Sequence, residues 1–128
     1  MTFWPSHVCR GELESCRQIL EKDPNHLGAL EISAQALWYE ENFEEVIKVT
    51  TRLIRLNPHE PGYRYTRGMA HLSVKNLKSA ETDFKQALLQ SQDFHFCEQV
   101  RRSLNALEVW IEESNRVAAL DNFSATIH

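Results

Sequence analysis

Hydrophobic side chains recur at helical spacing along most of this chain, and short polar turns separate the segments. The pattern predicts helices over residues 12–22, 27–39, 43–56, 62–74, 77–89 and 94–117. Proline-containing breaks at residues 23–25 and 57–61 end the first and third of these segments. Runs of alternating β-type residues are scarce, which argues against a sheet. We therefore expect an all-α protein whose last residues, 119–128, are frayed.

Two of the predicted helix pairs share one layout at a fixed spacing of 34 residues (68 − 34 = 34). A fixed period in this range is typical of a stacked repeat array. Small residues let two antiparallel helices approach closely, so Gly68 indicates that the facing helix, near Ala80, leaves no room for a larger side chain. The matched pairs are Ala34 and Gly68, Leu37 and His71, Phe43 and Leu77, Val46 and Ala80, Thr50 and Phe84, and Leu53 and Ala87.

Over about residues 11–93 this layout resembles the tetratricopeptide repeat (TPR) family. The resemblance implies a right-handed α-solenoid of antiparallel helix pairs; the alternative is an ordinary helical bundle with accidental self-similarity. Arg64 and Arg67 depart from the family by replacing usually apolar residues, Thr50 replaces an aromatic residue, and Gln92 replaces a proline. The matching residues are Leu30, Ala34, Leu37, Phe43 and Pro58 in one unit, and Gly68, Leu77, Ala80, Phe84 and Ala87 in the other.

We expect a single TPR-like domain over residues 1–118. Its units cover about residues 11–26, 27–60 and 61–93, followed by a cap at 94–118 and a frayed tail at 119–128. One period after Gly68 the chain has Arg102. A large charged residue is tolerated there only where no further helix packs on it, so the last helix is predicted to be the terminal cap that repeat arrays need.

Charge is distributed unevenly around the formal net charge of −4. Residues 1–45 carry nine acidic and three basic residues, residues 46–102 carry five acidic and ten basic ones, and residues 103–128 carry four acidic and one basic. No apolar run approaches the roughly 18 residues of a membrane helix, and the N-terminus lacks the apolar core of a signal peptide. Three cysteines without framework spacing predict reduced thiols and a cytoplasmic location.

Catalytic and cofactor chemistry find little support in the sequence, and we expect no enzyme, no cofactor and no metal site. The pairs His7-x-Cys9 and His95-x-Cys97 lie at opposite ends of the predicted solenoid, too far apart for one zinc tetrahedron. Acidic residues 40–45 fit a solvated helix start. The basic residues of the middle segment alternate with core positions, which favours an outer face over nucleic-acid binding.

Protein binding remains, because the first helix of each unit lines a concave peptide-binding surface in the resembled family. Carried onto this chain, the lining is Glu31, Gln35, Trp38, Tyr65, Met69 and Leu72, with Arg64 beside it. Core packing is the alternative role for Trp38 and Leu72, and a solvated face is the alternative for Glu31 and Gln35. We expect Tyr65 and Met69 to be exposed.

The resemblance also bears on the partner. One TPR subgroup grips the C-terminal carboxylate of chaperone tails with Lys, Asn and Arg. Glu31 and Gln35 stand where it needs Lys and Asn, so we predict no such clamp. Glu31 should instead hold the basic end of a bound segment, and Arg64 and Arg67 its acidic end.

The predicted function is therefore a non-catalytic adaptor or scaffold that binds a peptide or partner helix, without nucleic acid or membrane. Two alternatives stay open. One is a small TPR-type secretion chaperone. The other is a self-associating subunit that forms a homodimer through its incomplete N-terminal end, where apolar residues have little cover. Those residues are Phe3, Trp4, Val8 and Leu13.

Overall fold

The computed structural model describes residues 10–127, which form six α-helices without a strand. The all-α class is confirmed. Three residues of the proposed self-association surface, Phe3, Trp4 and Val8, lie outside the described range. The helices are α1 (Arg10–Lys22), α2 (Leu27–Tyr39), α3 (Phe43–Leu56), α4 (Pro61–Ser73), α5 (Leu77–Gln90) and α6 (Phe94–Ile127).

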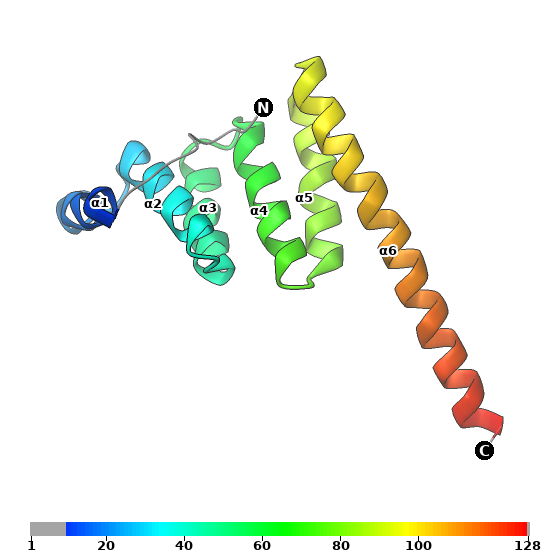
Figure 1. Ribbon diagram of the computed structural model, residues 1–128. Helices are drawn as coiled ribbons and strands as arrows, with labels where there is room; N and C mark the ends of the chain where they lie inside the picture. Colours follow the sequence, from blue (N-terminus) through cyan, green and yellow to red (C-terminus); the bar gives the residue numbers. More distant parts are fainter. Residues whose placement is uncertain (1–9, 128) are drawn as a thin grey trace.

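Each helix packs against the next one in the chain, so the molecule is a row of antiparallel helices (Figure 1). This arrangement is the α-solenoid predicted from the repeat. Leu13, predicted to lack cover, is buried in α1, which packs against α2. The prediction that Leu13 has little cover was therefore wrong, because the folded chain itself buries it.

The two helix–helix turns repeat in detail. Glu41 follows α2 with φ 58° and Lys75 follows α4 with φ 67°, and these two residues are 34 apart (75 − 41 = 34). Each is followed by an asparagine, Asn42 or Asn76, at the N-cap of the next helix. A non-glycine residue in the left-handed region is uncommon. Its recurrence at equivalent positions shows that both units close with the same turn.

Two core clusters fill the space between the helices. One joins α2, α3 and α4 through Leu30, Ala34, Leu53, Ile54 and Tyr63, and the other joins α5 and α6 through Ala80, Phe84, Ala87, Val100, Leu104 and Leu107. Gly68 faces Phe84 and Asp83. The prediction of a close approach there was correct, but the neighbour is the Phe84 ring and not Ala80.

Helix α6 is longer than predicted, since it continues from Val117 to Ile127. The expected frayed tail over residues 119–128 is therefore wrong up to Ile127. Residues 112–127 contain neither glycine nor proline, so nothing in the local sequence ends the helix. Its second half extends well past the end of α5 (Figure 1).

Candidate binding groove

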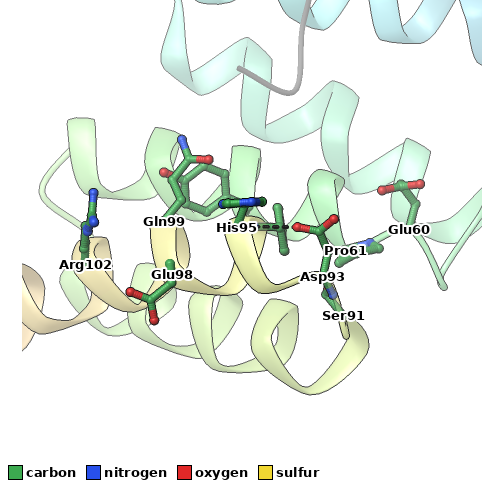
Figure 2. Close-up of a pocket in the computed structure, with 10 residues that line it drawn as sticks. Glu60, Pro61, Ser91, Asp93, His95, Glu98, Gln99 and Arg102 are labelled. Atoms are coloured by element: carbon green, nitrogen blue, oxygen red, sulfur yellow. Dashed lines mark hydrogen bonds between the residues drawn. The ribbon is translucent and has the colours of Figure 1, made fainter. Parts of the chain in front are cut away.

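A cavity of about 700 Å³ opens between the N-terminal halves of α4 and α6 (Figure 2). Helix α4 is the first helix of its repeat unit, and α6 occupies the equivalent position one period later. The cavity therefore lies between two helices of the type expected to line the groove. Its lining residues are Glu60, Pro61, Tyr65, Ser91, Asp93, His95, Phe96, Glu98, Gln99 and Arg102.

Tyr65 provides a fixed aromatic surface in this cavity. Its ring centroid is 5.6 Å from that of Phe84 and 5.8 Å from that of Phe96. Its hydroxyl lies 3.2 Å from Ser103 Oγ on α6. Because neighbours on α5 and α6 hold the Tyr65 side chain in place, a ligand can bind to its ring with little loss of side-chain entropy.

Two helix N-termini place carboxylates at one end of the cavity. Glu60 Oε1 accepts from the Gly62 backbone N–H at 3.1 Å, and Asp93 Oδ1 accepts from the Phe96 N–H at 2.8 Å. These caps arise locally, because Glu60 precedes the proline that begins α4 and Asp93 precedes α6.

The opposite charge lies at the other end of the cavity. Figure 2 shows Glu60 and Asp93 together at one side and Arg102 at the far side along α6. Arg102 is exposed, and Glu98 nearby accepts from Arg101 at 3.2 Å. The cavity is thus acidic at the helix N-termini, whereas the carboxylate of Glu98 and the guanidinium of Arg102 line it further along α6.

Glu31 and Gln35, two of the predicted groove residues, make contacts within the protein itself. Glu31 accepts a hydrogen bond from the hydroxyl of Tyr63, which joins α2 to α4. Burial, followed by this bond to Glu31, raises the pKa of Tyr63 well above its usual value. Gln35 is only 2% exposed. The alternative of a solvated face was wrong for Gln35, because its side chain is buried on α2.

The remaining apolar groove residues are half-buried. The Trp38 ring meets that of Phe43 edge-on at 5.1 Å. Met69 and Leu72, like Tyr65, pack against the α5–α6 core cluster. The exposure expected for Met69 and Tyr65 is therefore only partial, and each side chain contributes to the core as well as to the surface.

The predicted basic end of the groove was wrong for Arg67. Its Nε and Nη2 donate to Asp83 Oδ2 and Oδ1 at 2.8 and 2.7 Å, and Nη1 donates to Thr51 Oγ1 at 3.3 Å. Asp83 is 2% exposed, so this bidentate pair ties α4 to α5 inside the structure. Arg64 is half-buried, and its Nε has no hydrogen-bond partner among the described residues.

Sequence reasoning missed the contribution of α6 to the groove. Gln99 and Ser103 lie one period after Tyr65 and Met69 (99 − 65 = 34 and 103 − 69 = 34). The 34-residue spacing could have identified both. Because Arg102 marked α6 as a cap, its inner face was left out of the predicted lining.

Two further features were sought in the described part of the chain, a metal site and a membrane-spanning helix. Within residues 10–127, no three His, Cys, Asp or Glu side chains are placed to hold a metal ion. None of the helices in that range is both long and apolar enough to cross a membrane.

Comparison with known proteins bears on the fold. No protein-family model and no curated protein matches the chain. Among solved structures, it is similar to the first TPR of Spaghetti (RPAP3) bound to the HSP90 peptide SRMEEVD, with a TM-score of 0.69. The chain has a TPR-like fold. The aligned parts cover 78% of this chain and 77% of that one at 16% sequence identity, so the likeness concerns the fold alone.

Proposed function

We propose that this TPR-like chain is a non-catalytic interaction module that binds a peptide segment of a partner protein in the cavity between α4 and α6. The observation that carries the proposal is the cavity itself, which has a volume of about 700 Å³ and is lined by the fixed ring of Tyr65. Ligand sites typically enclose roughly 300–1,000 Å³, and tyrosine is prominent among interface hot spots.

A solved structure of the same fold supports this proposal. The first TPR of Spaghetti holds a short peptide, SRMEEVD. A short segment suits the cavity between α4 and α6, because it can lie along both helices and place one anchor side chain against Tyr65.

The charges of the cavity indicate the ligand's chemistry. Glu60 and Asp93 at one end favour a Lys or Arg side chain, and Arg102 at the other end favours an acidic one. Between them, Tyr65 and Phe96 suit an apolar or aromatic anchor. The proposed ligand thus places its basic residue at the N-termini of α4 and α6 and its acidic residue along α6.

Selection from a displayed library of random peptides tests this function. Binders are selected on the wild-type chain and then measured on Tyr65→Ala and on Lys85→Ala, a matched truncation of an exposed residue on α5. We expect enriched peptides that lose affinity at least about tenfold with Tyr65→Ala, as for a hot-spot residue, and keep it with Lys85→Ala. Enriched peptides that bind both variants equally would show that the cavity is not the binding site.

A further inference from the structure

From Val109 onward, α6 carries exposed apolar side chains that the peptide groove does not use. The five side chains of this stripe are between 49% and 64% exposed. They are Val109, Trp110, Val117, Leu120 and Phe123. Scattered exposed apolar residues are ordinary, but a contiguous row along one helix face indicates a contact surface.

The stripe faces away from the body of the solenoid. Leu107 belongs to the α5–α6 core, and Ile111 packs against that core. Val109 lies two residues from each of them and therefore roughly 160° around the helix axis. Since α6 also extends past α5 (Figure 1), a second helix can lie along this face without displacing α5.

Two residues of opposite charge, Glu113 and Arg116, lie between Val109 and Leu120 on the same helix face. Val109, Glu113, Arg116, Leu120 and Phe123 follow one another at spacings of four, three, four and three residues, which places them on one helix face. Glu113 Oε2 accepts from Arg116 Nη1 at 3.1 Å, and both side chains are at least 60% exposed. The row is therefore apolar at both ends and charged in the middle.

This order of charges is complementary to its own reverse. We infer that α6 pairs with α6 of a second copy of the chain, antiparallel about a two-fold axis midway between Glu113 and Arg116. In that register each residue lies level with the one whose number makes the sum 229, and the two meet where both face the partner helix. Glu113 meets Arg116 of the second copy (113 + 116), and Val109 meets Leu120 (109 + 120).

The antiparallel direction follows from the same two charges. A parallel pairing in register would instead place Glu113 on Glu113 and Arg116 on Arg116, and like charges directly opposite are unfavourable.

The resulting contact is small. One helix from each copy contributes a single row of side chains, so the interface falls at the low end of specific interfaces, below about 1,200 Å². We expect a weak, reversible dimer with a Kd on the order of micromolar to tens of micromolar. The contact lies beyond the cavity residues of α6, so dimerisation and peptide binding can be measured with different variants.

Charge reversal tests both the partner and the register. Sedimentation equilibrium of the full chain is compared for the wild type, Glu113→Arg, Arg116→Glu and an equimolar mixture of the two variants. Each single variant brings like charges together and should dimerise at least about tenfold more weakly. The mixture restores both opposite-charge contacts, so it should form heterodimers with an affinity near that of the wild type.

Glu108→Arg is the matched control, because it makes the same charge change on an exposed residue of α6 that lies off the stripe. It should leave dimerisation within about threefold of the wild type. A wild-type chain that stays monomeric at concentrations on the order of 100 μM would overturn the inference. So would a dimer that Glu113→Arg does not weaken, or variants whose mixture stays monomeric.

Discussion

Gly68 on α4 lies so close to Phe84 on α5 that a methyl group at position 68 would come within 2.7 Å of the ring atom Cε1. Phe84 is fully buried and cannot move aside freely. Glycine in a helix costs about 1 kcal/mol relative to alanine, so its use here reflects this contact. The same close approach allows Tyr65, on the same helix, to stack against Phe84 from the cavity side.

Gly68→Leu should therefore lower the free energy of unfolding by about 1–3 kcal/mol through overpacking. Urea unfolding followed by circular dichroism measures it. Arg102→Leu changes the equivalent position one period later, where the side chain is exposed, and should stay within about 0.5 kcal/mol of the wild type. Equal losses for both variants would contradict the role given to Gly68.

The pair formed by Arg67 and Asp83 should be a second sensitive point. Asp83→Ala leaves the Arg67 guanidinium, which is 19% exposed, without its bidentate partner. We expect a loss of about 3–5 kcal/mol in the free energy of unfolding, as for other buried ion pairs that lose one member. Glu81→Ala removes a carboxylate from the same helix that pairs with Lys85 at the surface, and should cost less than about 1 kcal/mol. Similar losses for the two would show that the buried pair adds nothing.

Stability should also depend on pH through His71. Burial lowers the pKa of His71; Asp83 opposes this shift, and Arg67 adds to it. The pKa in the folded chain is thus below that in the unfolded chain, about 6.5. The stability linked to neutral His71 is present above about pH 6.5 and is lost as the pH falls through the folded-state pKa.

His71→Gln removes this titration. Between about pH 7 and pH 5, the urea midpoint of the wild type should fall more steeply than that of His71→Gln. Midpoints that decline in parallel would show that protonation of His71 is not linked to unfolding.

Much of the fold could be predicted from the sequence, because the helix signals are local. The 34-residue period and the breaks at prolines locate α2 to α5 to within a residue or so at each end. The end of α6 could not be predicted in this way, because residues 112–127 contain no glycine or proline that would stop a helix. The site was harder to predict, since it depends on which helices come together.

The groove residues show why. Gln35 lies at a position typical of a groove, yet its side chain is buried in the folded chain. Arg67 appears in the sequence as a free cation, and only the fold brings Asp83, sixteen residues away, into contact with it. The 34-residue period places Gln99 at the position equivalent to Tyr65, but the prediction that α6 is a cap excluded Gln99 from the predicted groove lining. Tyr65, by contrast, was predicted as a lining residue and does line the cavity.

The charge of the cavity leads to a prediction about ligands. The peptide SRMEEVD, which the first TPR of Spaghetti holds, has one basic residue and three acidic ones. It should bind this chain at least about tenfold more weakly than a selected peptide with a net positive charge, because the cavity lining has three carboxylates, on Glu60, Asp93 and Glu98, and one guanidinium, on Arg102. Isothermal titration calorimetry at low salt measures both affinities, and comparable affinities would contradict the proposed charge preference.

Glu60→Gln tests the acidic end of the cavity itself. Glutamine keeps an oxygen that can accept from the Gly62 N–H, so the cap of α4 is preserved while the charge is removed. A selected basic peptide should associate more slowly with this variant at low salt, and its rate should depend less on salt concentration. Stopped-flow fluorescence gives both rates; an unchanged association rate would place the basic residue of the ligand elsewhere.

The most direct test of the binding site is a titration of the ¹⁵N-labelled full chain with a selected peptide, followed by backbone amide shifts. We expect the largest shifts on residues around the cavity, Tyr65, Phe96, Gln99 and Arg102, and we expect them to vanish in Tyr65→Ala. Largest shifts on α3 or on the outer face of α5, with those four amides unchanged, would contradict the proposed binding site.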